Sequence, residues 1–476
     1  MTETKKKFRI EDLRTLDGWR AFFMGNAYPA LVAALVLFGN LTALDYYVNF
    51  LITGFFVFAV IVCDSARPLI ITVCTYIYQI SITHAPSYPT YSDFLFSDWR
   101  KPVSILIVLI AAFGFIYFFV KKKIYRKLTP KSTPILLPTA AFSVAMLLNG
   151  AFSSDWTYQN LIFAFLSTLV YFFFFLIIYH GFSEKETSEE LGRYFAYISL
   201  LMAAIIVCEM AHLFITSDKI FVDGSIDKER VALGWGIWNL MGTSLSVLIP
   251  SLFYGAMVNK YPWLYFGAAT VTYLFAVLTM SRNALVFATL AYGACIIISC
   301  FVGKNKKAYR IITAAGVAAI LLFALVFFGK IKLILGDYFD RGFSDNGRYA
   351  LWELAVETFK KAPVFGNGFY GFFTDAVFEF GGVPRMAHNT ILEILAAMGV
   401  FGILAYLWYR VETVRLFVRR PSIMKTMLGL SILVFLLGSL LDNFVFNIHP
   451  PLYYSVALAI VCRSEAEKRM CIENSL

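Results

Sequence analysis

The sequence predicts an all-α, polytopic integral membrane protein with about 12–14 transmembrane helices and one long extracytoplasmic loop before a late helix. Of its 476 residues, 59% are hydrophobic and only 15% are charged, and the mean hydropathy is +0.70. Apolar runs of about 20 residues, the length that crosses a bilayer, recur along the chain. One hydrophilic stretch, residues 335–387, interrupts these runs late in the sequence. A soluble core does not need so many apolar runs.

The expected spans follow one another with short polar connections. In chain order they are residues 28–44, 48–63, 66–82, 102–120, 134–149, 158–180, 194–215, 235–256, 262–280, 283–302, 311–333, 390–408, 426–442 and 451–463.

Basic side chains predict how these spans are oriented. With the N-terminus inside, most Lys and Arg fall on the cytoplasmic side, among them Lys5-Lys6-Lys7, Lys121-Lys122-Lys123 and the cluster at residues 304–310. Residues 1–27 lack the apolar core and cleavage site of a signal peptide and are expected to be a cytoplasmic leader. Both termini are therefore expected in the cytoplasm.

The position of the long loop divides the rest of the chain. Residues 28–220 are expected to be N-terminal transmembrane helices, residues 221–410 a catalytic region that includes loop 335–387, and residues 411–476 further helices with a cytoplasmic tail. The loop is moderately apolar and contains a helix-like run at residues 349–356, which indicates a folded cap on the membrane.

Several kinds of chemistry are not signalled. The seven cysteines form no CxxC pair, and the chain has no D-x-D, P-loop, G-x-S-x-G or H-E-x-x-H motif. No metal and no cofactor is therefore expected. The net charge of +10 is interpreted first as an orientation signal and second as affinity for anionic membrane lipids or substrate, and no nucleic-acid partner is expected.

Three arginines fall on the predicted outer surface. Arg282 follows Ser281, a good N-cap, so a helix is expected to begin there with its N-terminus outward. A helix N-terminus beside a guanidinium suits phosphate oxygens. Arg230 precedes the eighth expected span, and Arg348 lies in the long loop. Each of these arginines could instead be an interfacial anchor or part of a structural salt bridge.

A histidine ends the long loop. His388 is expected to open the helix at residues 390–408, where the positive helix end and nearby arginines favour a neutral imidazole that can act as a base. A helix cap or a core histidine is the alternative. Asn389 and Glu393 share a helix face, whereas Glu393 is poorly placed to orient His388. His449 is a second outward histidine and the reserve candidate.

Together these residues resemble the O-antigen ligase and polymerase superfamily of bacterial membrane glycosyltransferases, over roughly residues 225–410. The residues that carry the resemblance are Arg230 with Gly234 and Asn239, Ser281-Arg282 with Leu285, Gly347-Arg348 with Trp352, Pro363 with Gly366-Asn367-Gly368-Phe369, and His388-Asn389-Thr390-Ile391-Leu392-Glu393 followed by Gly399 and Gly402. One departure is Trp238, which stands where the family often has a proline before the asparagine.

The resemblance implies a multi-pass protein of the bacterial cytoplasmic (inner) membrane, active in polysaccharide biosynthesis for the cell envelope. It implies an undecaprenyl-diphosphate-linked glycan as donor and an acceptor glycan or lipid anchor, with metal-independent inversion at the anomeric carbon. Arg282, Arg230 and Arg348 would hold the diphosphate, and His388 would take the proton of the acceptor. Ser281, Asn389 and Glu393 would support them.

Two questions stay open at this stage. Polymerase, ligase and protein glycosyltransferase differ in their acceptor, and no residue separates them, although the polymerase is preferred. A flippase for polyprenyl-linked glycan, or another transporter, would also explain the helices. Its pathway could use Glu209 and His212, which share a face of the seventh span.

Overall fold

The computed structural model describes most of the chain and is almost entirely helical. The described residues are 10–42, 44–79, 100–154, 156–217, 220–222, 225–227, 230–233, 236–303, 305–326, 347–372, 386–447 and 449–473. The fold is 81% helical. Strands in this part of the chain form two short antiparallel hairpins, β1 (Phe221–Val222) with β2 (Ser225–Ile226) and β3 (Ala232–Leu233) with β4 (Gly236–Ile237). The predicted all-α polytopic fold is confirmed.

Each expected span coincides with a helix. The N-terminal helices are α1 (Leu16–Met24), α2 (Ala27–Thr42), α3 (Asp45–Val62), α4 (Leu69–Gln79), α6 (Arg100–Lys121), α7 (Leu136–Leu147), α8 (Tyr158–Thr168), the π-helical turn η4 (Leu169–Phe174) and α9 (Phe175–Gly181). The C-terminal helices are α10 (Ser188–Thr216), α11 (Trp238–Val258), α12 (Pro262–Leu278), α13 (Arg282–Phe301), α14 (Lys306–Val326), α16 (Arg348–Lys361), α18 (Thr390–Val418), α19 (Ile423–Leu441) and α20 (His449–Glu473). Short 3-10 turns are η1 (Ile10–Arg14), η3 (Ile124–Arg126) and η6 (Phe444–Phe446).

Fewer of these helices are long enough to cross a bilayer than the sequence suggests. In the described part of the chain, seven helices are both long and apolar enough, and an eighth span results if α1 and α2, bent by 71°, are counted together. Helices α7 and α12 and residues Ile105–Lys121 of α6 are apolar but shorter. The chain is a multi-pass membrane protein, and some of its apolar helices, such as α7 with 12 residues, are shorter than a bilayer-spanning helix.

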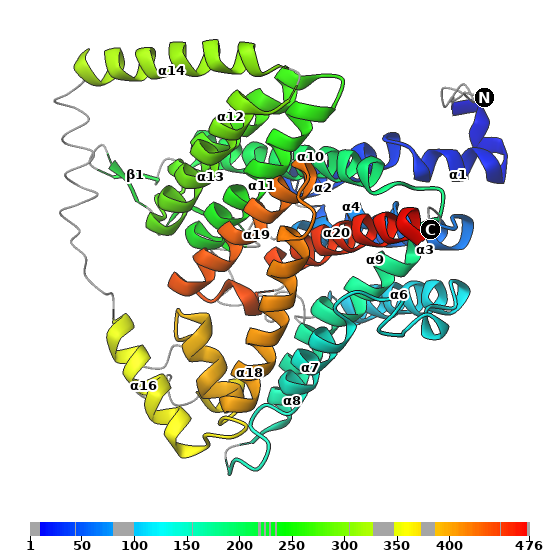
Figure 1. Cartoon of the computed structure of the whole chain (residues 1–476), viewed down its shortest axis with the longest axis vertical. Helices are drawn as coiled ribbons and strands as arrows, with labels where there is room; N and C mark the ends of the chain where they lie inside the picture. Colours follow the sequence, from blue (N-terminus) through cyan, green and yellow to red (C-terminus); the bar gives the residue numbers. More distant parts are fainter. Residues whose placement is uncertain are drawn as a thin grey trace.

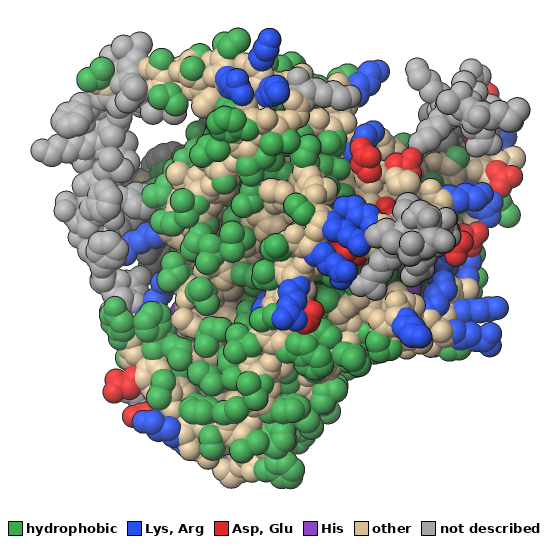
Figure 2. Space-filling view, in the orientation of Figure 1, with side chains coloured by type: hydrophobic (Ala, Val, Ile, Leu, Met, Phe, Trp, Pro, Cys, Tyr) green, Lys and Arg blue, Asp and Glu red, His purple; other side chains and the backbone are tan. Residues whose placement is uncertain are grey.

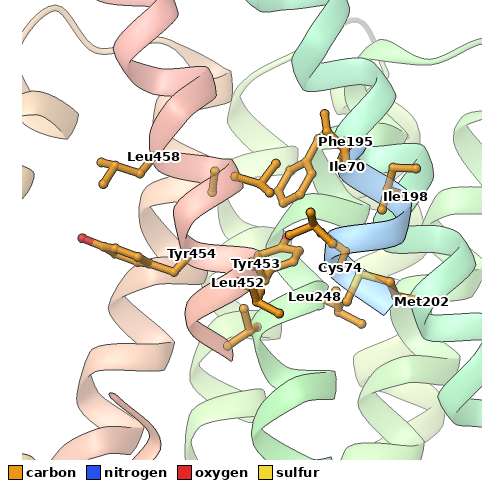
Figure 3. Close-up of a cluster of buried hydrophobic side chains, with 14 of the residues drawn as sticks. Ile70, Cys74, Phe195, Ile198, Met202, Leu248, Leu452, Tyr453, Tyr454 and Leu458 are labelled. Carbon is orange, nitrogen blue, oxygen red and sulfur yellow. The ribbon is translucent and has the colours of Figure 1, made fainter. Parts of the chain in front are cut away.

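Helix α11 lies at the centre of the bundle. Of its most apolar window, 89% is buried, because α10, α12, α13 and α19 all pack against it. Figure 3 shows Leu248 of α11 meeting Ile198 and Met202 of α10 and Cys74 of α4, beside the start of α20. Since lipid tails are as apolar as these side chains, close packing holds such helices together more than the hydrophobic effect does.

A buried arginine lies on the other side of α20. Tyr454 points away from the cluster in Figure 3 and is one of four tyrosines around Arg410 of α18. The ring centroids of Tyr171, Tyr406, Tyr409 and Tyr454 lie 4.7–5.9 Å from the Arg410 guanidinium carbon. Cation–π attraction strengthens when both partners leave water. These rings therefore stabilise a charge inside the bundle.

Helix α18 is broken at Gly399, and the end of the long loop fills the break. Gly399 has φ +64° and ψ −160°. The amides of Val400 and Phe401 donate to the carbonyls of Pro363 (2.9 Å) and Val364 (3.1 Å). In return, the amides of Asn367 and Gly368 donate to the carbonyls of Ala396 (2.8 Å) and Ala397 (3.0 Å). The backbone groups freed by the break are thus satisfied inside the protein, as a membrane interior demands.

Two asparagines from the N-terminal half hold this loop in place. Asn149, between α7 and α8, accepts a hydrogen bond from the amide of Phe369 (3.1 Å), and Asn160 of α8 accepts one from the amide of Tyr370 (2.6 Å). Gly366, at φ +70°, packs so tightly that a Cβ there would lie 2.3 Å from the carbonyl carbon of Ala397. The glycine-rich motif is therefore a backbone latch.

The described part of the predicted loop is folded. Helix α16 contains the helix-like run of residues 349–356 and packs against α18 (Figure 1). Trp352 donates from Nε1 to the carbonyl of Ala387 (2.9 Å), and Ala355, Phe372 and Ala396 bury one another beside it. Residues 335–346 and 373–385 of the loop, including Asp345-Asn346, lie outside the described residues.

The loop helix and the chain ends lie at opposite sides. Figure 1 shows α16 across the molecule from α1 and from the C-terminal end of α20. In Figure 2, apolar side chains cover most of the visible body, and Lys and Arg side chains gather toward the side of α1 and the α20 end. The placement of both termini in the cytoplasm stays a prediction from the sequence.

Candidate active site

His388 lies just outside a helix, not within it. The expectation that it opens the helix is wrong, because Asn389 is the N-cap of α18 and accepts from the amides of Ile391 (2.9 Å) and Leu392 (3.1 Å). His388 itself has φ +50°. A left-handed backbone costs about 1–2 kcal/mol for a residue other than glycine, so its surroundings must hold it there.

An aspartate orients the imidazole. Nδ1 of His388 lies 2.8 Å from Oδ1 of Asp442, which follows the last residue of α19. An ionised carboxylate can only accept, so this contact places the proton on Nδ1. Nε2 then carries the free lone pair, as a general base requires. The His388 side chain is 34% exposed and that of Asp442 13%, so the imidazole remains accessible while its partner is shielded.

The same carboxylate connects His388 to the arginine-bearing helix. Asn239, in the first turn of α11, donates from Nδ2 to Oδ2 of Asp442 (3.1 Å). Ser281 donates from Oγ to Oδ1 of Asn239 (2.8 Å) and accepts from the amide of Ala284 (3.3 Å). We call His388, Asp442, Asn239 and Ser281 the polar chain. Its bonds converge on the carboxylate of Asp442, which accepts from Asn239 on one oxygen and from the imidazole on the other.

Ser281 is the N-cap of α13, as the sequence predicts. The cap leaves Arg282 as the first helical residue, with an exposed side chain. Arg282 therefore projects from a helix N-terminus one residue from the polar chain. Free amides and a guanidinium at one helix end together favour an anion.

The other two arginines lie near the same helix ends. Arg230 stands two residues before β3, and Asn239 two residues after β4, so the β3–β4 hairpin carries Arg230 back toward the start of α11. Its guanidinium pairs with Asp227 (3.0 Å) and is 45% exposed. Arg348 is the first residue of α16, the helix that Trp352 fastens to the residue before His388. The structure thus links Ser281 to His388 directly through side chains, and places the arginines on neighbouring elements.

The predicted supporting residues hold the backbone of His388. Nδ2 of Asn389 donates to the carbonyl of Leu440 (3.1 Å), and Thr390 donates to Asn443 (3.1 Å), so α18 is tied to the end of α19 on both sides of Asp442. Glu393 is fully buried, and its Oε2 accepts from the amide of Ala387 (2.7 Å). Glu393 therefore fixes the preceding residue and does not orient the imidazole.

Asp442 and Asn239 are absent from the set of site residues predicted from the sequence. Asp442 ends an apolar run on the same predicted side as His388, and an acidic residue there is a recognisable signal. Asn239 belongs to the resemblance, and the missing proline before it does not prevent it from joining the polar chain.

Three further candidates from the sequence are His449, Glu209 and His212. His449 is the first residue of α20. Glu209 is buried and accepts from Asn40 of α2, whereas His212 is exposed. Within the described ranges, no three His, Cys, Asp or Glu side chains are grouped as a metal site would need.

Part of this region is similar in sequence to a known protein family. Residues 266–407 match the O-antigen ligase family model. This part of the chain is similar to O-antigen ligases. The match runs from α12 into α18 and includes Arg282, Arg348 and His388, while Asn239 and Asp442 lie outside it. No curated protein matches the chain. The predicted resemblance to the O-antigen ligase and polymerase superfamily is confirmed, and the match indicates ligase- or polymerase-like glycosyl transfer in polysaccharide biosynthesis.

Proposed function

We propose that the protein transfers or polymerises a glycan linked to undecaprenyl diphosphate on the extracytoplasmic face of the bacterial inner membrane, without a metal and with inversion. The observation that carries this proposal is the imidazole of His388, which lies within the region similar to O-antigen ligases and is held by Asp442 from beyond it. A base presented at the end of a membrane loop needs an acceptor with an acidic proton, and a glycan hydroxyl provides one.

The reaction is a single displacement. Nε2 of His388 takes the proton of the acceptor hydroxyl as the oxygen attacks the anomeric carbon. The bond between that carbon and the diphosphate oxygen breaks, and its electron pair leaves with the lipid diphosphate. One glycosidic bond forms, one glycosyl phosphate bond is lost, and attack from the opposite face inverts the carbon. Asp442 stabilises the imidazolium that results.

Arginines hold the leaving group in this proposal. Arg282 lies one residue from the polar chain, and Arg230 precedes the hairpin that leads to Asn239. Guanidinium groups bind diphosphate oxygens in pairs and stabilise the charge that develops as the bond breaks. Arg348, on α16, would reach the donor from the loop. Since general-base action contributes roughly 10²–10⁴-fold, positioning and leaving-group stabilisation supply the rest.

The test is glycan transfer by the purified protein from an undecaprenyl-diphosphate glycan, with and without EDTA. His388→Ala should lose product by about 10²–10⁴-fold, and EDTA should have no effect. His212→Ala is the matched control, because His212 is exposed on α10 and lies outside the polar chain.

The outcomes separate the alternatives. A ladder of lengthening products indicates a polymerase, whereas a single added chain on an anchor indicates a ligase. Equal product from His388→Ala and wild type would overturn the base assignment. Lipid-linked glycan that crosses liposome membranes without transfer to any acceptor would instead identify a flippase.

A further inference from the structure

A second polar site lies at the other end of the bundle. A cavity of about 230 Å³ opens where four connections meet, and Arg67, Glu190, Arg193, Tyr194, Tyr197 and Asn259 contribute to its lining. These lining residues lie at or near the ends of helices. Arg67 lies between α3 and α4, Glu190 to Tyr197 lie in the first turns of α10, and Asn259 is the C-cap of α11.

The cavity is far from the polar chain. Asn239 and Asn259 stand at opposite ends of α11, whose 21 residues span about 30 Å at roughly 1.5 Å per residue. That distance equals the hydrocarbon thickness of a bilayer. The cavity therefore lies at the level of the lipid headgroups on the face opposite His388, the side of α1 and the α20 end in Figure 1.

Arg67 gives the wall of the cavity a donor for an anion. Its guanidinium carbon lies 4.3 Å from the ring of Tyr194, which is only 3% exposed, and the two side chains bond to each other. The side chain of Asn259 bonds with that of Tyr265, a further lining residue. Nε of Arg67 is buried and has no hydrogen-bond partner among the described residues. A guanidinium that keeps a donor without a protein partner beside a cavity indicates a ligand that accepts.

The charges around the cavity indicate which class of ligand fits it. Arg67 and Arg193 are positive. Glu189 pairs with Arg193 (2.6 Å), and the exposed carboxylate of Glu190 also reaches the lining. Two positive and two negative groups suit a ligand that carries both signs better than a polyanion. Tyr197, whose hydroxyl donates to the Asn26 carbonyl (3.3 Å), adds an aromatic wall at the interface.

We infer that this cavity binds the headgroup of a zwitterionic phospholipid, a phosphate joined to an ammonium group. Its phosphate accepts from Arg67, and its ammonium lies toward Glu190. The site does not depend on the glycan-transfer proposal, since it lies on the opposite face and shares no residue with the polar chain. A lipid held there joins α3, α10 and α11 at their ends and stabilises the bundle.

The experiment measures lipid retention and thermal stability. Purified protein is stripped of lipid in detergent and exposed separately to phosphatidylethanolamine, phosphatidylglycerol and inorganic phosphate. Bound lipid is counted by native mass spectrometry, and Tm is recorded. Phosphatidylethanolamine should bind and raise Tm. Binding of inorganic phosphate with no lipid retained would overturn the headgroup assignment, and equal binding of both lipids would overturn the role of Glu190.

Substitutions of the lining residues test whether the lipid binds in this cavity. Arg67→Gln should weaken phosphatidylethanolamine binding by about tenfold, the equivalent of one lost charged contact. Tyr194→Phe removes the hydroxyl that bonds with Arg67 and keeps the ring against the guanidinium, and it should weaken binding a few-fold without unfolding the protein. Glu190→Gln should abolish the preference for phosphatidylethanolamine over phosphatidylglycerol. Arg126→Gln is the matched control, an exposed arginine at η3 outside the cavity lining. Unchanged binding in both Arg67→Gln and Tyr194→Phe would overturn the proposal.

Discussion

The two ends of α11 both carry an asparagine, yet the two asparagines have different surroundings. At the N-terminal end, Asn239 uses its amide nitrogen and oxygen to join Asp442 to Ser281. At the C-terminal end, Asn259 bonds with Tyr265, and both side chains line a cavity beside Arg67. A closed set of hydrogen bonds between protein side chains positions a catalytic group, whereas charged and polar side chains around a cavity provide a place for a ligand.

The strongest test of the polar chain is Asp442→Asn. An asparagine presents either an amide nitrogen or an oxygen to Nδ1 of His388, and with the nitrogen toward the ring the proton moves to Nε2. The base is then lost although the shape is kept. We expect kcat to fall by on the order of 10²–10⁴, with Tm little changed. Transfer assays beside thermal unfolding check this, and wild-type kcat would exclude Asp442 as the orienting group.

Asn239→Leu should have the next largest effect. It removes one partner of Asp442 and the acceptor of Ser281 while keeping a similar volume. We expect kcat to fall about tenfold, as for loss of one supporting hydrogen bond to an ionised group. Asn239→Asp should be worse than Asn239→Leu, because two carboxylates would then face each other. If both variants transfer glycan normally, the polar chain has no part in catalysis.

Gly366→Ala tests the close contact between the glycine-rich motif and α18. The added Cβ would lie 2.3 Å from the carbonyl carbon of Ala397 at φ +70°, so the loop must move away from α18. We expect a loss of stability of about 1–3 kcal/mol, with a partial loss of activity. Gly267→Ala in α12 is the control, since a Cβ there meets nothing within 4 Å. Equal melting temperatures for the two variants would show that the latch is not needed.

The smallest effect on catalysis is expected for a substitution at the C-terminal end of α11. Asn259→Ala removes a polar lining side chain from the cavity, together with its bond to Tyr265, and touches no part of the polar chain. Transfer activity should stay within about twofold of wild type, while phosphatidylethanolamine binding should fall a few-fold. A loss of transfer as large as that of Asn239→Leu would mean that the two ends of α11 are coupled.

Local patterns in the sequence were enough to predict most of the helices and to select some residues of the candidate site. Apolar runs set the spans, and Ser281 caps α13 as its side chain chemistry requires. His388 could be selected because a histidine at the end of an outward loop is unusual for a passive membrane segment. Its backbone could not be predicted, because the left-handed conformation depends on Asn389, Trp352 and Glu393 acting together.

The sequence by itself determined the all-α membrane class, the order of the helices and the side chains available for chemistry, since apolarity and capping act over a few residues. Only the tertiary structure decided which groups meet. Asp442 lies 54 residues from His388, the loop at Pro363 fills the break at Gly399, and the cavity joins Arg67 to Asn259. Such contacts depend on how the helices pack against one another. Which apolar faces pack together cannot be predicted from a repeating pattern in the sequence.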